Sequence, residues 1–131
     1  RSLGIAGSVQ FHGFVPYERL PDFYRRAAVF LLTSSYEGFG RVLVEAQLHG
    51  IPCVSTRTLG AQDVIEHDRT GFLHDVGDIR GMAESVARLL DDRDTNTHMG
   101  REGAALVREK FDPAALARQW MELLANVADH P

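Results

Sequence analysis

Two carboxylates and two glycines lie close together in residues 33–46. Glu37 precedes Gly38 and Gly40 in a short loop. Glu45 follows within a mostly apolar stretch that begins at Val42. Glycines directly before a helix let backbone N–H groups come close to a ligand, and the helix N-terminus adds the positive end of its dipole. Such a loop can bind a phosphate group, but loops of this type also serve as plain structural turns. The loop by itself leaves both interpretations open.

The residues after this loop place one polar stripe on a helix that is otherwise apolar. Arg41, Glu45 and His49 recur at every fourth position, which puts them on one helix face. In one interpretation this is a solvated face with an Arg41–Glu45 ion pair worth about 0.3 kcal/mol. In the other, Glu45 accepts hydrogen bonds from both hydroxyls of a vicinal diol, such as that of a ribose. Glu37 is either a solvated loop acid or an acceptor for sugar hydroxyls beside the phosphate.

A second pair of carboxylates is Asp92 and Asp94, with the spacing of a metal-binding Asp-x-Asp motif. It follows a predicted helix rather than a strand, so we expect a solvated acidic loop and no metal site. The histidines fall in different predicted elements and lack the spacing of metal ligands. Cys53 has no basic neighbour in the sequence, and we expect a buried strand residue rather than a reactive thiol.

Short strands that alternate with helices would position these residues. Strands are predicted at residues 9–15, 29–32, 52–55 and 71–74. Helices are predicted at residues 20–28, 41–49, 61–65, about 79–90, 96–110 and from Asp112-Pro113 onward. This alternation indicates right-handed crossovers and a parallel sheet, in which ligands bind at the carboxyl ends of the strands. In the last helix an apolar stripe predicts one buried face: Leu116, Trp120, Leu123, Leu124 and Val127.

Composition excludes several classes of protein. The 131 residues are 44% hydrophobic and 24% charged, as in a soluble globular domain. The net charge is −4 and the 14 basic residues are scattered, so we expect no nucleic-acid partner. The single cysteine excludes an internal disulfide and fits a reducing compartment. We therefore expect a cytoplasmic protein, whose peripheral contact with the inner membrane face would come through a segment outside this chain.

In motif order and spacing, the sequence resembles the C-terminal, donor-binding domain of the retaining GT-B glycosyltransferases. This large group (group 1, family 4-like) includes bacterial mannosyltransferases, sucrose synthase and mycothiol-pathway enzymes. The centre of the resemblance is a pair of glutamates with seven residues between them, Glu37 and Glu45. Residues 11–15 (FHGFV), 50–54 (GIPCV) and 70–73 (TGFL) surround it in the family's order, and the likeness runs from Val9 to the final helix.

The resemblance implies a role for each site residue. Glu37, as the catalytic residue, would contact hydroxyls of the donor sugar and orient it rather than attack it. Glu45 would hold the ribose hydroxyls of a nucleotide diphosphate sugar, and Gly13 would border the base. The sugar and phosphates would be lined, largely through backbone groups, by Gly38, Phe39, Gly40 and Arg41.

The implied fold is α/β, a Rossmann-like parallel sheet flanked by helices that forms an incomplete C-terminal half of a GT-B fold. Residues 1–131 would form a partial nucleotide-sugar-binding domain, with its first strand and helix and the whole N-terminal acceptor domain absent. The family's basic pair that neutralises the diphosphate lies upstream of Arg1. Its double glycine is Leu59-Gly60 here, which predicts a different approach of that loop to the donor. Helix N–H groups and basic side chains would replace a metal, so no cofactor is expected.

These expectations describe a hexosyltransferase that moves a sugar from a nucleotide diphosphate sugar to an acceptor and retains the anomeric configuration. The acceptor, a saccharide, lipid or small molecule, would bind mainly to the missing N-terminal domain, so this chain alone is expected to be inactive. The alternatives are a GT-B-type sugar-nucleotide epimerase and a non-catalytic nucleotide-sugar-binding module. A hydrolase with Glu37 and Glu45 as an acid/base pair is less favoured, because the two carboxylates would face different parts of one ligand.

Overall fold

The computed structural model describes the backbone of residues 3–128 and the side chains of residues 3–121. Three strands form one parallel sheet in the order β1-β2-β3: β1 (Phe30–Leu32), β2 (Cys53–Thr56) and β3 (Gly71–His74). Leu31 pairs with Val54, which in turn pairs with Phe72, so these three side chains share one face. The predicted α/β architecture with a parallel sheet is confirmed.

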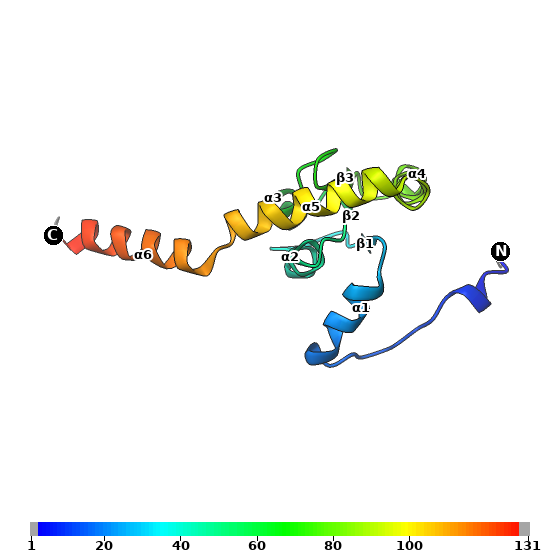
Figure 1. Cartoon of the computed structure of the whole chain (residues 1–131), viewed down its shortest axis with the longest axis horizontal. Helices are drawn as coiled ribbons and strands as arrows, with labels where there is room; N and C mark the ends of the chain where they lie inside the picture. The colour runs from blue at the N-terminus through cyan, green and yellow to red at the C-terminus, as the bar shows by residue number, and fades with distance from the viewer. Residues whose placement is uncertain (1–2, 129–131) are drawn as a thin grey trace.

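Helices connect and cover these strands (Figure 1). The α-helices are α1 (Leu20–Arg26), α2 (Arg41–Leu48), α3 (Leu59–Val64), α4 (Ile79–Asp91), α5 (Arg93–Lys110) and α6 (Pro113–Ala128). Two short 3₁₀ turns precede them, η1 (Ala6–Ser8) and η2 (Tyr17–Arg19). Among the described residues, no helix combines the length and the apolar character needed to cross a membrane.

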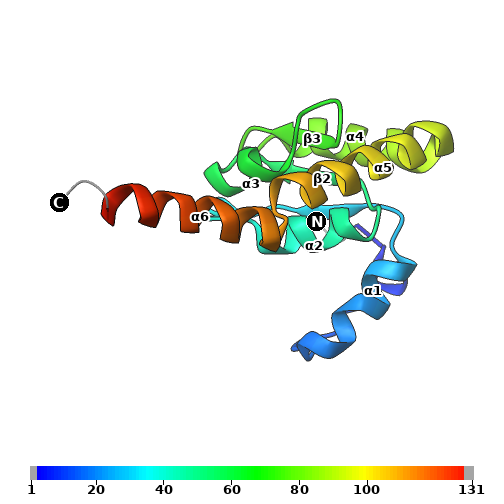
Figure 2. The ribbon, with the colours of Figure 1, turned by 60° about the vertical axis from the view of Figure 1, so that its left-hand side comes forward.

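The two faces of the sheet bury different clusters. Leu43 of α2 and Val64 of α3 pack with Cys53 on one face, and Cys53 is fully buried as predicted. Met82 of α4 packs with Val54 and Phe72 on the other face. Figure 2 shows α2 and α4 on opposite sides of the sheet, with α5 alongside. Because the sheet is covered on both faces, its strands read as continuous apolar runs in the sequence.

The strand predicted at residues 9–15 is wrong. These residues have an irregular backbone, and Phe11 and Phe14 are almost fully exposed. A strand is stable only when its N–H and C=O groups pair with a neighbour, and the segment lies away from the sheet (Figure 1). The alternating apolar pattern is therefore present without the pairing that would turn it into a strand.

The last helix starts where the sequence predicts, but its buried face is wrong. The Asp112 carboxylate accepts hydrogen bonds from the N–H groups of Ala114 and Ala115, both at 3.1 Å, as expected of an N-cap. Leu116 is 40% and Trp120 is 63% exposed. Figures 1 and 2 show α6 extending outward from the end of α5, away from the sheet. The side chains of Leu123, Leu124 and Val127 lie outside the described residues.

Candidate functional site

The loop of residues 33–40 leaves the carboxyl end of β1 and leads into α2, so it lies at the edge where parallel sheets bind ligands. Two contacts tie it to the rest of this edge. The hydroxyl of Thr56, at the end of β2, donates to the carbonyl oxygen of Ser34. The N–H group of Gly60, in α3, donates to the carbonyl oxygen of Glu37 at 2.9 Å. The loop is therefore held from two neighbouring elements.

Glu37 turns its carboxylate toward the start of α2. Its Oε1 accepts a hydrogen bond from the N–H group of Gly40 at 3.3 Å. Gly40 is the N-cap of α2 and has φ 73°, in the left-handed region that favours glycine. The N–H groups of Arg41 and Val42 lie before the helical hydrogen-bond ladder begins, so they face outward with the positive end of the helix dipole. This arrangement can bind an anion such as a phosphate.

Phe39 contributes its backbone rather than its ring to this loop. The ring packs edge-on against Phe111 at a centroid distance of 5.5 Å. On the other side, the loop backbone meets Gly60 closely enough that a Cβ atom there would lie 2.6 Å from the Phe39 nitrogen. Leu59-Gly60 stands in place of a double glycine, and Gly60 is the position at which the close contact with the loop backbone requires a glycine.

Glu45 lies one turn further along α2 and is largely buried, with 15% of its side chain exposed. Its Oε1 accepts from the Arg41 Nε at 2.8 Å, and its Oε2 accepts from the phenolic oxygen of Tyr24 at 3.0 Å. The Arg41 guanidinium also lies over the ring of Tyr17, 4.8 Å from its centroid. Contacts with Tyr17 and Glu45 raise the pKa of Arg41. The Arg41–Glu45 ion pair that the spacing predicts is present, but Glu45 does not lie on a freely solvated face.

A pocket of about 190 Å³ opens beside the Glu45 carboxylate. Its lining residues come from η2, α1 and α2: Tyr17, Glu18, Leu20, Pro21, Tyr24, Glu45 and His49. The His49 ring stacks on Tyr24 at 5.1 Å, and His49 is the C-cap of α2. The pocket therefore combines apolar walls with a few polar groups, among them the carboxylates of Glu18 and Glu45, a pattern typical of small-molecule sites.

The structure brings six of the seven predicted site residues onto one loop and the following helix. They are Glu37, Gly38, Phe39, Gly40, Arg41 and Glu45. Gly13 lies apart, exposed and at φ 61°, in the N-terminal segment that runs away from the sheet (Figure 1). Sequence reasoning missed Tyr24 and Tyr17, which contact Glu45 and Arg41. Only the apolar face of residues 20–28 hinted that a tyrosine there would be buried.

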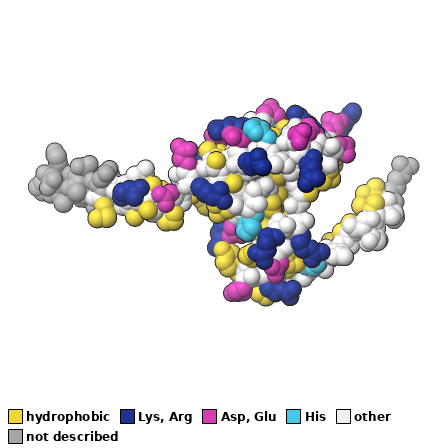
Figure 3. Space-filling model, in the orientation of Figure 1, with side chains coloured by type: hydrophobic (Ala, Val, Ile, Leu, Met, Phe, Trp, Pro, Cys, Tyr) yellow, Lys and Arg dark blue, Asp and Glu magenta, His cyan; other side chains and the backbone are white. Residues whose placement is uncertain are grey.

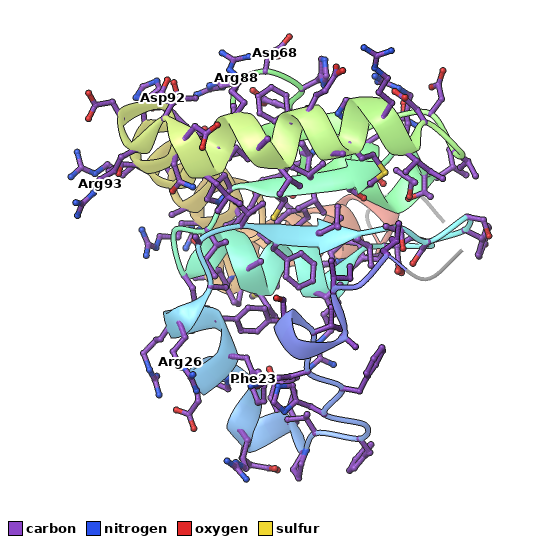
Figure 4. All side chains as sticks on the ribbon, turned by 90° about the vertical axis from the view of Figure 1, so that its right-hand side faces the viewer. Phe23, Arg26, Asp68, Arg88, Asp92 and Arg93 are labelled. Atoms are coloured by element: carbon purple, nitrogen blue, oxygen red, sulfur yellow. The ribbon has the colours of Figure 1, made fainter. Side chains whose placement is uncertain are left out.

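Asp92 and Asp94 lie at the other end of the molecule. Asp92 caps α5, and its Oδ1 accepts from the N–H groups of Asp94 at 3.1 Å and Thr95 at 3.0 Å. Asn96, one turn later, donates to the carbonyl oxygen of Ala28, just before β1 begins. Figure 4 shows Asp92 near the amino-terminal end of the strands, on the opposite side of the molecule from the edge toward which the strand arrows point. Among the residues whose side chains are described, no three His, Cys, Asp or Glu residues are grouped to hold a metal ion.

Known proteins with similar sequences are enzymes that use sugars. The chain is 33% identical to N-acetyl-alpha-D-glucosaminyl L-malate synthase of Bacillus anthracis over 127 residues, which are 97% of this chain and 33% of that protein. The chain therefore spans about a third of that relative's length.

Solved structures of other proteins have a similar fold. Sucrose-phosphate synthase from Thermosynechococcus elongatus matches with a TM-score of 0.86 and 28% identity, over 97% of this chain and 32% of that one. HepE from Anabaena, solved in complex with UDP-glucose, matches with a TM-score of 0.84 and 30% identity, over 95% of this chain and 34% of that one. The three-stranded sheet and its helices thus correspond to part of a GT-B glycosyltransferase fold.

The sequence profile of one family covers most of the chain. It is described as Glycosyl transferases group 1 and matches residues 1–106, which include every predicted site residue. The chain belongs to the group 1 glycosyltransferases.

Proposed function

We propose that this chain binds a nucleotide diphosphate sugar for a glycosyltransferase that retains the anomeric configuration of the transferred sugar. The observation that carries the proposal is the placement of two carboxylates, one in the loop just before α2 and one on α2 itself. Glu37 lies at the N-terminus of α2 and Glu45 borders a pocket one turn further along. Glu45 lies five positions after Gly40, or roughly 7.5 Å along the helix.

Each part of this arrangement matches one part of the ligand. The outward N–H groups of Arg41 and Val42 would bind the diphosphate, since helix N-termini favour anions. Glu45 would accept hydrogen bonds from the ribose hydroxyls beside the pocket. Glu37 would accept hydrogen bonds from hydroxyls of the sugar, which is joined to the phosphates at the end opposite to the ribose. HepE, which shares this fold, binds UDP-glucose, and this supports a nucleotide sugar as the ligand.

The chemistry that this site would supply is electrostatic. During transfer, negative charge accumulates on the leaving diphosphate, and N–H groups that already point at it stabilise that charge. Glu37 is held through Oε1 by the N–H group of Gly40, which suits a group that orients the sugar. The acceptor and the remaining charge on the diphosphate would be handled by parts of the protein outside this chain. The buried free thiol of Cys53 fits the cytoplasmic location that we propose.

A ligand screen followed by a product analysis tests this function. UDP, GDP and ADP and their glucose or mannose derivatives are added to the chain, and binding is followed by NMR chemical shifts. We expect shifts at residues 37–45 with at least one nucleotide sugar. The longest polypeptide that contains this chain is then incubated with that donor and candidate acceptors. A transferred sugar with the donor's anomeric configuration supports the proposal, whereas an epimerised donor or an inverted product contradicts it.

A further inference from the structure

Tyr24 is a buried phenol that contacts the candidate nucleotide site from a different helix. It belongs to α1, its side chain is 7% exposed, and it packs in the same core cluster as Leu43 and Cys53. Its ring lies 6.0 Å from that of Phe30 and stacks on His49. A tyrosine side chain has few rotatable bonds, and packing fixes them here. The phenolic oxygen is therefore a fixed point beside the site.

This fixed oxygen donates to Glu45, and Arg41 donates to the other carboxylate oxygen. The Tyr24 hydroxyl bonds Oε2 at 3.0 Å and the Arg41 Nε bonds Oε1 at 2.8 Å. A carboxylate oxygen has two lone pairs, so each oxygen keeps capacity for one further donor. Two such acceptors side by side are what the two hydroxyls of a vicinal diol require.

The two donors differ in how firmly they hold the carboxylate. The Arg41 side chain is mostly exposed, and an exposed ion pair of this kind contributes little. The Tyr24 contact is partly buried, and burial together with the Glu45 carboxylate raises the pKa of Tyr24 well above its ordinary value. The phenol therefore stays protonated and keeps donating throughout the neutral pH range.

We propose that Tyr24 is a positioning residue, which holds the Glu45 carboxylate so that its free acceptor positions meet the two ribose hydroxyls of a nucleoside diphosphate. This inference rests on the proposed function of Glu45. It adds α1 to the nucleotide site, although α1 carries none of the residues that the glutamate motif identifies. Tyr24 acts through Glu45 and not by contact with the reacting atoms.

The test compares UDP with 2′,3′-dideoxy-UDP, which lacks both hydroxyls, in binding titrations with the chain and its Tyr24→Phe variant. Wild-type protein should prefer UDP. The loss of the hydrogen bond from Tyr24 to the Glu45 carboxylate should weaken UDP binding about 3- to 10-fold. Affinity for the dideoxy compound should change by less than about twofold, because the variant removes only the contact that serves the diol. A merely structural role would weaken both ligands equally.

Controls keep the outcomes distinct. Trp120→Phe changes an exposed aromatic ring on α6, outside the candidate site, and should leave both affinities unchanged. If Tyr24→Phe fails to fold, p-aminophenylalanine and p-methylphenylalanine at position 24 both fill the space, and only the first should keep the preference for UDP.

Two results would be informative in different ways. If wild-type protein binds both compounds equally, or binds none of UDP, GDP and ADP at millimolar concentration, the proposed function fails and this inference fails with it. If wild-type protein prefers UDP and Tyr24→Phe prefers it just as strongly, the role of Tyr24 is refuted while the role of Glu45 stands.

Discussion

The backbone N–H group of Gly60 donates a 2.9 Å hydrogen bond to the backbone carbonyl oxygen of Glu37. This bond joins the loop after β1 to the start of α3, and so fixes the backbone of the residue that we assign to the donor sugar. The approach is close: a Cβ atom on Gly60 would lie 2.6 Å from the Phe39 nitrogen and 2.8 Å from the Gly38 carbonyl carbon. The nearest atoms all belong to the backbone of Gly38 and Phe39, so no flexible side chain could move aside.

Replacement of Gly60 by alanine should therefore destabilise the chain. We expect Gly60→Ala to lower the free energy of unfolding by about 1–3 kcal/mol, the range for inserting atoms into a packed site. Gly7→Ala is the matched control, because a Cβ atom on Gly7 would point into open space and its φ is ordinary; it should change stability by less than about 0.5 kcal/mol. Urea denaturation measures both. Equal stability of the two variants would contradict the close contact.

Nucleotide binding should not depend on a divalent metal. The groups that would meet the diphosphate are the N–H groups at the start of α2, which do not require a cation. Titration of UDP or GDP in excess chelator should give the same Kd as in Mg²⁺, within about twofold. The double substitution Asp92→Asn and Asp94→Asn should also leave Kd unchanged, since Asp92 caps α5 at the opposite end of the sheet. Binding that is lost on chelation and restored by Mg²⁺ or Mn²⁺ would contradict this prediction.

Stability should fall in acid through two helix caps. A hydrogen bond from the Gly81 N–H group lowers the pKa of Asp78, and the Thr95 hydroxyl and N–H group lower that of Asp92, both from an ordinary value of 3.8. Because these pKa values are depressed in the folded state, the stabilisation is present above pH 3.8 and is lost as the pH falls through the folded-state values. The variant Asp78→Asn, Asp92→Asn keeps a capping side chain and should lose less stability between pH 5 and pH 3. If the free energy of unfolding falls by the same amount in wild-type protein and in the variant between pH 5 and pH 3, the two caps are not the cause of the loss.

The chain should self-associate at high concentration. Leu31 lies on the edge strand β1 and is 50% exposed, and a hollow of about 450 Å³ runs between β1 and α4, lined almost entirely by apolar side chains. Figure 3 shows further apolar side chains along the N-terminal segment and α6. Leu31→Lys should shift the association to higher concentration, since a charge protects an exposed edge. Val76→Lys, in an exposed loop, is the control. Light scattering that shows a monomer at every concentration would contradict this prediction.

Local patterns in the sequence were sufficient to predict the three strands of the sheet and the loop that carries Glu37. The apolar runs of the strands and the helix start at Asp112 lie where the residues predict. These features depend on neighbours in the chain, so spacing captures them. The Arg41–Glu45 pair is of the same kind.

Features that depend on distant parts of the chain were not predictable. Tyr24 and Glu45 are 21 residues apart, and only the packing of α1 against α2 brings the phenol to the carboxylate. The strand expected at residues 9–15 has the correct alternation but no neighbour to pair with. The stripe on α6 likewise predicts burial, yet Leu116 and Trp120 stay largely exposed. Alternation and periodicity reveal a face that can be buried, and the partner decides whether it is.

The central claim is that Glu45 serves the ribose and Glu37 the sugar, and one set of titrations tests it directly. UDP, UDP-glucose, GDP and GDP-mannose are titrated by calorimetry into wild-type protein, Glu45→Ala and Glu37→Ala, in the longest polypeptide that contains this chain. For the base that binds, Glu45→Ala should weaken the diphosphate and its sugar derivative alike, by about 1.5–3 kcal/mol, the range for hydrogen bonds to a charged group. Glu37→Ala should leave the diphosphate affinity nearly intact and weaken only the sugar derivative. Normal diphosphate binding by Glu45→Ala, or an equal loss of both ligands in Glu37→Ala, would contradict the account.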